Sequence, residues 1–122
     1  MKALVVDSSN TMRSVLGRIL SMRGFEVEEA DDGLKALEVL RRIGIADVVL
    51  VDWNLAQLDG LEFVTCLRRE SSRDTLVIMM VTAEPGQREI QRALIAGAND
   101  YLLKPFNSLQ IDQKLALAGL AE

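Results

Sequence analysis

The run Val48-Val49-Leu50-Val51 is apolar at every position and leads directly into Asp52. A strand that is apolar on both faces is typical of the middle of a parallel sheet, where other elements cover both sides. Three other short apolar runs also lead into a single polar residue: residues 4–6 into Asp7, residues 76–81 into Thr82, and residues 101–103 into Lys104. We therefore expect a buried sheet with four polar side chains at the ends of its strands.

Stretches with helical spacing of apolar residues separate these runs. The first of them carries Leu16, Ile19 and Met22, and similar patterns follow each later run. Near residues 25–28, apolar and charged residues alternate, which is typical of an edge strand with one solvent-exposed face. We predict an α/β fold, a doubly wound five-stranded parallel sheet with five helices on two faces. The flavodoxin-like strand order 2-1-3-4-5 places the ligand site between the first and third strands, where the order reverses.

The composition of the chain excludes several functional classes. The 122 residues suffice for one domain, and the net charge of −4 argues against a nucleic-acid partner. The chain has no histidine, which excludes a Ser-His-Asp triad and an imidazole zinc site, and Cys66 has no second cysteine for an internal disulfide. No apolar run has the length of a membrane span or a secretory signal, so we expect a cytoplasmic protein without membrane contact.

The four polar side chains suit a divalent cation and a phosphoryl group. Asp52 comes well before the next predicted helix, which starts near Asp59, so it is poorly placed to cap that helix. It is either a solvated loop aspartate or the acceptor of a phosphoryl group. Asp7 is either a helix cap or part of a magnesium site that would screen the two anions from each other. Thr82 and Lys104 would then contact the phosphoryl oxygens.

Motifs along essentially the whole chain resemble those of the receiver domains of two-component response regulators, most of all the stand-alone, CheY-like type. The matching segments are Val5-Val6-Asp7, Asp52-Trp53-Asn54, Leu58-Asp59-Gly60, Val81-Thr82-Ala83-Glu84, Gly97-Ala98 and Tyr101-Leu102-Leu103-Lys104-Pro105-Phe106. The resemblance implies one receiver (response regulatory) domain at residues 1–122, with no output domain. It also implies a signalling phosphoprotein that is not an enzyme, beyond assisting its own phosphorylation and dephosphorylation.

The resemblance assigns the chemistry of the site to individual residues. Asp52 would be the phosphoacceptor, and Lys104 and Thr82 would contact the phosphoryl group. The ligands of Mg²⁺ would be Asp7, Asp52 and the backbone carbonyl of Asn54, with Ser8 as a further candidate. A partner sensor histidine kinase or phosphotransfer protein would supply the phosphoryl group.

The resemblance also implies how the signal would leave the site. Thr82 and Tyr101 would form a switch pair, although an isolated tyrosine in a strand is more often a half-buried core residue. Asn54 and Glu84 would tune the lifetime of the acyl phosphate, and the bond before Pro105 would be cis. A downstream protein would bind the face formed by the fourth helix, the last strand and the last helix. The chain would be a monomer or a transient homodimer.

Two residues depart from the family pattern. Ser8 stands where a second acid is usual, and Ala56 stands where proline is common. A neutral hydroxyl is a much poorer ligand than a carboxylate for a hard dication, so we expect weakened magnesium binding, slower phosphorylation, or both. The alternative hypothesis is a phosphorylation-impaired receiver that acts as a constitutive protein-interaction adaptor. A flavin carrier or hydrolase of the flavodoxin type is disfavoured, because the first strand lacks a hydroxyl- and glycine-rich phosphate loop.

Overall fold

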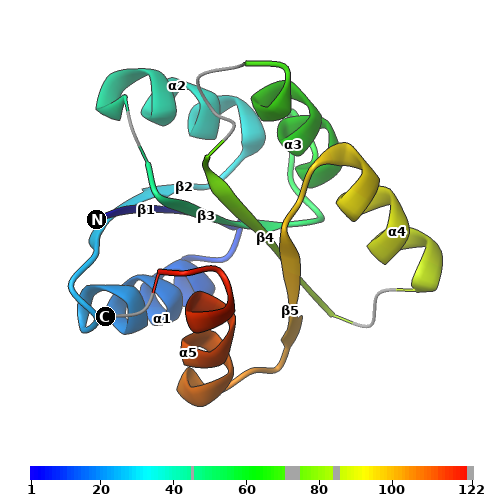
Figure 1. Cartoon of the computed structure of the whole chain (residues 1–122). Coiled ribbons are helices and arrows are strands. Elements are labelled where there is room, and N and C mark those ends of the chain that lie inside the picture. The colour runs from blue at the N-terminus through cyan, green and yellow to red at the C-terminus, as the bar shows by residue number, and fades with distance from the viewer. Residues whose placement is uncertain (45, 71–74, 84–85, 121–122) are drawn as a thin grey trace.

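The computed structural model describes residues 1–44, 46–70, 75–83 and 86–120. Its centre is a parallel sheet with the strand order β2-β1-β3-β4-β5 (Figure 1). The predicted fold class and strand order are therefore confirmed. The strands are β1 (Lys2–Val6), β2 (Glu26–Ala30), β3 (Val48–Asp52), β4 (Val77–Ala83) and β5 (Asp100–Lys104). The helices are α1 (Asn10–Ser21), α2 (Gly33–Ile43), α3 (Gly60–Arg68), α4 (Gln87–Ala96) and α5 (Ser108–Leu117).

Helices cover both faces of the sheet. Figure 1 shows α1 and α5 on one face and α2, α3 and α4 on the other. Two separate apolar clusters result, one that includes Leu16 and Leu115 and one that includes Leu40 and Phe63. All residues of β3 are buried, as its apolar sequence predicts, because this central strand contributes side chains to both clusters.

The amphipathic strand β2 lies at an edge of the sheet, as predicted. Three other strands extend slightly further than their apolar runs suggest. Asp52, Thr82 and Lys104 lie within β3, β4 and β5 rather than after them. The parallel pairing explains the extension, because Asp52 is paired with Val81 and Ala83 is paired with Lys104. No helix in the described ranges is long and apolar enough to cross a membrane.

Polar side chains cap the starts of α1, α2, α3 and α5. The Ser9 hydroxyl accepts a hydrogen bond of 3.1 Å from the backbone N–H of Met12 and so caps α1. Asp32 and Asp59 cap α2 and α3 in the same way. The capping alternative for Asp7 is therefore wrong, since Ser9 takes that role and leaves the Asp7 side chain at the end of β1.

Gly60 brings the start of α3 close to the end of β3. Its backbone N–H donates to the Trp53 carbonyl at 3.1 Å. A Cβ at this position would overlap the carbonyl oxygen of Asp52 and would lie 2.9 Å from the Cα of Trp53. Only glycine permits this approach without a backbone shift, so Gly60 helps to fix the peptide that carries Asp52.

Candidate functional site

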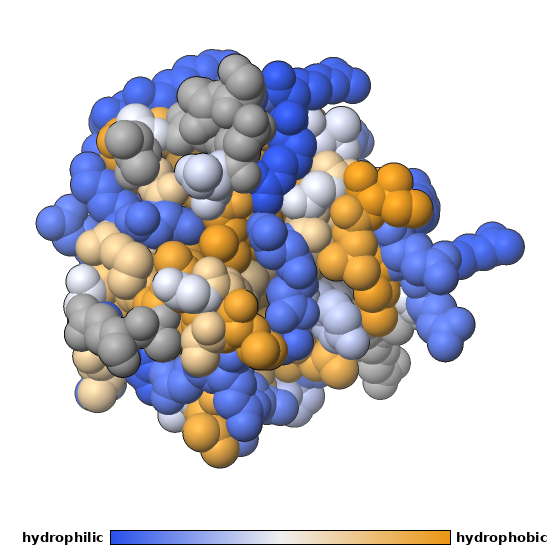
Figure 2. All heavy atoms as spheres, viewed as in Figure 1, coloured by the Kyte–Doolittle hydropathy of each residue, from blue (hydrophilic) through white to orange (hydrophobic). Residues whose placement is uncertain are grey.

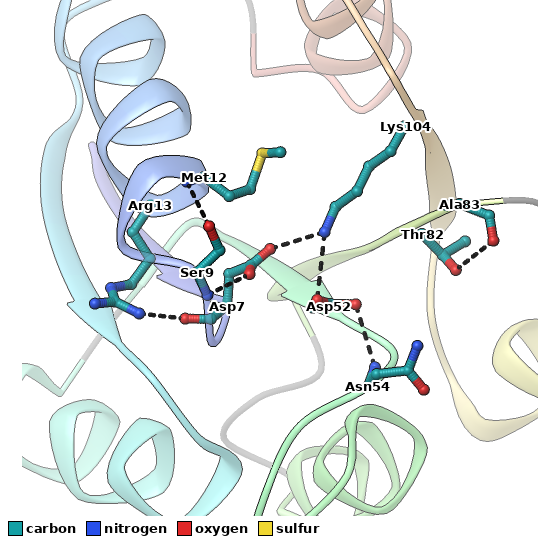
Figure 3. A network of polar contacts seen from close by, with 9 residues as sticks. All are labelled: Asp7, Ser9, Met12, Arg13, Asp52, Asn54, Thr82, Ala83 and Lys104. Atoms are coloured by element: carbon teal, nitrogen blue, oxygen red, sulfur yellow. Dashed lines mark hydrogen bonds and ion pairs between the residues drawn. The ribbon is translucent and has the colours of Figure 1, made fainter.

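Three charged side chains meet at the carboxyl edge of the sheet. Asp7 follows β1, Asp52 ends β3 and Lys104 ends β5. The Nζ atom of Lys104 lies 3.0 Å from Oδ2 of Asp7 and 3.3 Å from Oδ2 of Asp52 (Figure 3). Strands β1 and β3 are the neighbours at which the strand order reverses, the position where such sheets bind ligands. The structure thus brings together three of the four predicted strand-end residues.

The backbone holds each carboxylate in a fixed orientation. Oδ1 of Asp7 accepts a hydrogen bond of 2.9 Å from the N–H of Ser9, and Oδ1 of Asp52 accepts one of 3.2 Å from the N–H of Asn54. In both residues this leaves Oδ2 for the ammonium of Lys104. Both carboxylates therefore present one oxygen to the same cation.

Burial reduces the screening of these three charges by water. The exposed fraction of the side chain is 2% for Asp7, 12% for Asp52 and 21% for Lys104. Buried charges are tolerated where they are paired and hydrogen-bonded, as they are here. Burial alone would lower the pKa of the Lys104 ammonium. The hydrogen bond to Asp7 and the charge of Asp52 outweigh that effect, so the pKa of Lys104 lies above its ordinary value.

Arg13 also belongs to the site, although it was not predicted as a site residue. Its Nη1 donates to the backbone carbonyl of Asp7, and its Nη2 donates to the side chain of Asn10. Its Nε lies 3.4 Å from a carboxylate oxygen of Glu29. Helical side chains point toward the N-terminus of their helix. A long cationic residue one turn after the cap Ser9 was therefore the feature of the sequence that could have predicted the contact of Arg13 with the end of β1.

The remaining strand-end residue, Thr82, does not contact Asp52. Its hydroxyl donates to the carbonyl of Ala83 at 3.4 Å, and in Figure 3 it points toward Ala83 rather than toward the carboxylates. Thr82 and Tyr101 instead line one small apolar pocket, together with Trp53 and Ile90. The structure thus relates the two predicted switch residues to each other through this pocket.

The other predicted site residues lie at the rim or beyond the described ranges. Ser8 and Asn54 are exposed. Glu84 lies outside the described residues, so the structure says nothing of its predicted role. The peptide bond between Lys104 and Pro105 is cis, as expected.

The donor atoms at the site are compatible with Mg²⁺. Two carboxylate oxygens already face a single cation, the Lys104 ammonium, and a hard dication accepts such oxygens together with backbone carbonyls and water. The acids are few, however. Within the described ranges, no three His, Cys, Asp or Glu side chains are grouped closely enough to hold a metal ion. Asp7 and Asp52 would have to supply all of the carboxylate ligands.

Comparison with known proteins gives a consistent result. The family model described as "Response regulator receiver domain" matches residues 3–116. Chemotaxis protein CheY1 of Helicobacter pylori is 40% identical over 116 residues, which cover 94% of each chain. A chemotaxis protein CheY homolog of Campylobacter jejuni is also 40% identical, over 94% of this chain and 89% of the relative. The solved structure of CheY4 of Vibrio cholerae matches with a TM-score of 0.89 and 33% identity, over 96% of this chain and 97% of that chain.

Proposed function

This chain belongs to the response regulator receiver domain family, and from that premise we propose that Asp52 accepts a phosphoryl group from a partner sensor histidine kinase or phosphotransfer protein. The family places the chain among CheY-like signalling domains of two-component systems rather than among enzymes in the usual sense. The observation that carries the proposal is the position of Lys104, which pairs with both Asp52 and Asp7 at the reversal of the strand order.

In the proposed reaction a carboxylate oxygen of Asp52 attacks the phosphorus atom. The bond from phosphorus to the donor's imidazole nitrogen breaks, and that nitrogen keeps the electron pair. The product is an acyl phosphate on Asp52. The ammonium of Lys104 lies beside the carboxylate that would carry the new charge, so it can stabilise that charge without a large movement. The N–H of Asn54 keeps the carboxylate oriented.

Magnesium would be held by Asp7, Asp52 and the backbone carbonyl of Asn54, and it would reduce the repulsion between the carboxylate and the incoming phosphoryl group. Ser8 would contribute little, because its hydroxyl is neutral and its side chain is exposed. With fewer acids around the ion, we expect Mg²⁺ to bind more weakly than in a receiver with a second acid at this position.

The signal would leave through the face formed by α4, β5 and α5. Thr82 would turn from Ala83 toward the phosphoryl group, and Tyr101 would move within the pocket that both residues line. Leu94, Ile95 and Leu103 are exposed on α4 and β5, and Ile95 is 86% exposed. Figure 2 shows hydrophobic surface over α4, beside strongly hydrophilic side chains. Exposed apolar surface of this kind supports a protein contact.

Trp53 offers a direct test, because it is the only tryptophan and it follows Asp52. We expect its fluorescence to change on addition of Mg²⁺ and again on addition of beryllofluoride, which mimics a phosphoryl group. A small phosphodonor should add the mass of one phosphoryl group to the protein. The Asp52→Asn variant should show neither the second change nor the mass increase. A native protein that gains no mass with any donor would refute the proposal.

The second candidate function is a constitutive adaptor that is not efficiently phosphorylated. The exposed, neutral Ser8 favours it, because only Asp7 and Asp52 remain to hold a metal, and Lys104 already pairs with both. An adaptor would bind its target equally well as the native protein and as the Asp52→Asn variant. A receiver that signals by phosphorylation would bind more tightly after treatment with the phosphodonor. A cytoplasmic location and a monomer or transient homodimer stay predictions.

A further inference from the structure

A lysine of α5 lies over the ring of Tyr101. The Nζ atom of Lys114 is 4.9 Å from the centre of the ring. The same atom is 2.9 Å from Oδ1 of Asp100, and this oxygen also accepts the backbone N–H of Tyr101 at 2.8 Å. One carboxylate oxygen thus holds both the strand that carries the ring and the ammonium that covers it.

This arrangement favours one orientation of the ring. An ammonium over the face of an aromatic ring is attracted by the negative charge of that face. Lys114 and Asp100 are both largely buried, with exposed fractions of 27% and 26% for their side chains, so water screens the contact only partly. Because Asp100 already restrains Lys114, little further side-chain entropy is lost when the ammonium covers the ring. Rotation of the ring away from Lys114 would lose the attraction.

A small apolar space adjoins the ring. Tyr101 lines the small apolar pocket between α4 and the sheet, which is also lined by Thr82, Met80 and Ile90. The lining residues come from β4, β5, α4 and Trp53 just after β3, whereas Lys114 comes from α5. The ring therefore lies between a cation on one helix and a pocket beside another.

We propose that Lys114, held in place by Asp100, is a positioning residue that keeps the Tyr101 ring in its present orientation and opposes its movement further into the pocket shared with Thr82. The effect of this restraint on signalling rests on the proposed function, in which that movement accompanies phosphorylation. The restraint itself is a property of the resting protein. Contact of Lys114 with an acidic partner would compete with Asp100 and the ring, and would thereby release Tyr101.

The ring orientation can be measured directly, because Tyr101 is the only tyrosine in the chain. Three-bond couplings from the backbone nitrogen and carbonyl carbon to the ring carbon Cγ report its χ1 rotamer in solution. The test compares the native protein with Lys114→Gln, which removes the cation, and Lys114→Arg, which keeps it. Lys35→Gln is the control, because Lys35 of α2 forms an ion pair of the same length, 2.9 Å, with Asp31, which precedes α2. Thermal unfolding verifies that every variant is folded.

We expect the couplings of the native protein, Lys114→Arg and Lys35→Gln to report one dominant rotamer. Those of Lys114→Gln should shift toward rotamer averaging. Native couplings in Lys114→Gln would overturn the proposal, and so would an equal shift in Lys114→Arg, because a loss of packing rather than of charge would then be responsible.

A second measurement separates this proposal from the proposed function. With Mg²⁺ present, beryllofluoride should change the Tyr101 couplings of the native protein. The concentration for half of this change should be about two- to fivefold lower in Lys114→Gln, which corresponds to the usual strength of such a contact. If beryllofluoride leaves the Tyr101 couplings of the native protein unchanged, the movement of Tyr101 in the proposed function is refuted, and the restraint in the resting protein stays supported. If the Tyr101 couplings of Lys114→Gln change at the same beryllofluoride concentration as those of the native protein, the restraint is contradicted.

Discussion

Lys104 and Asp7 are 97 positions apart in the sequence, yet their charged atoms lie 3.0 Å apart. Lys104 belongs to the edge strand β5, and its side chain reaches across the end of β4 to the acids at β1 and β3. The ammonium therefore pairs with both of the carboxylates that would hold a divalent cation. The resting protein pairs its acids internally, and a bound metal would have to compete with that pairing.

Removal of the ammonium should destabilise the fold. In Lys104→Met the side chain keeps much of its apolar length, but Asp7 and Asp52 lose their shared counter-ion. Asp7 is almost fully buried, so we expect a loss of about 1–3 kcal/mol in the free energy of unfolding at neutral pH. Urea unfolding followed by circular dichroism measures it. Lys35→Met is the control, since its pair is exposed, and a comparable loss in that variant would contradict the special role of Lys104.

The contribution of Lys104 should disappear at alkaline pH. Its pKa in the folded protein is raised above the ordinary value of 10.5, so the folded state binds the proton more tightly than the unfolded state. The stabilisation is complete below the ordinary lysine pKa and is lost as the pH rises through the folded value. The difference in unfolding free energy between the native protein and Lys104→Met should therefore stay constant to about pH 9.5 and shrink above it. If this difference in unfolding free energy already shrank near neutral pH, the pKa of Lys104 would be lowered in the folded protein, contrary to the prediction.

An acid at position 8 should convert the site into a stronger metal site. We expect Ser8→Asp to tighten Mg²⁺ binding by about tenfold, because a carboxylate is a far better ligand than a hydroxyl for this ion. Without Mg²⁺ the added charge repels Asp7 and Asp52, so the same variant should be less stable by about 1 kcal/mol. Fluorescence of Trp53 and urea unfolding measure the two effects.

A matched control distinguishes binding of the metal by the new carboxylate from the effect of its charge alone. Ser14→Asp places the same extra charge on α1, where the residue is exposed and follows the site by several positions. It should leave the Mg²⁺ affinity nearly unchanged, because solvent screens the charge of an exposed side chain. Equal Mg²⁺ affinities of Ser8→Asp and the native protein would show that position 8 is not part of the metal site.

The sequence predicts the fold because the pattern of apolar residues in a strand indicates whether the strand is central or at an edge of the sheet. The wholly apolar run that became β3 could only be central, and the alternating charges of β2 could only lie at an edge. Those two facts and the rules of parallel sheets favour the observed strand order, and this order brings Asp7, Asp52 and Lys104 to one edge of the sheet. The exact strand ends do not follow, because backbone pairing continues beyond the last apolar side chain.

The details of the site depend on contacts that a local pattern does not contain. The bond from Arg13 to the Asp7 carbonyl requires the strand end and the helix start to be placed relative to each other. The same holds for Lys114, whose helical position alone does not show that it covers Tyr101. Such contacts follow from tertiary packing, so they appear only in the structure.

The close approach of Gly60 to β3 gives a last prediction, on the backbone that carries the acceptor. A methyl group in Gly60→Ala would overlap the carbonyl of Asp52 and meet the Cα of Trp53, and both are backbone atoms that cannot easily move aside. We expect a loss of about 1–3 kcal/mol in unfolding free energy. The fluorescence of Trp53 should also shift in the folded variant, because the peptide after Asp52 must move.

Gly17→Ala is the matched control for this substitution. Gly17 is also buried, but it lies inside α1, and an added Cβ would be 3.6 Å from Cγ1 of Val27, an ordinary contact. Alanine is a better helix former than glycine, so Gly17→Ala should be neutral or more stable by up to about 1 kcal/mol. Phosphorylation by a small donor should slow in Gly60→Ala and stay unchanged in Gly17→Ala. If both variants kept the native rate, the position of the Asp52 peptide would not depend on the close packing of α3 against β3.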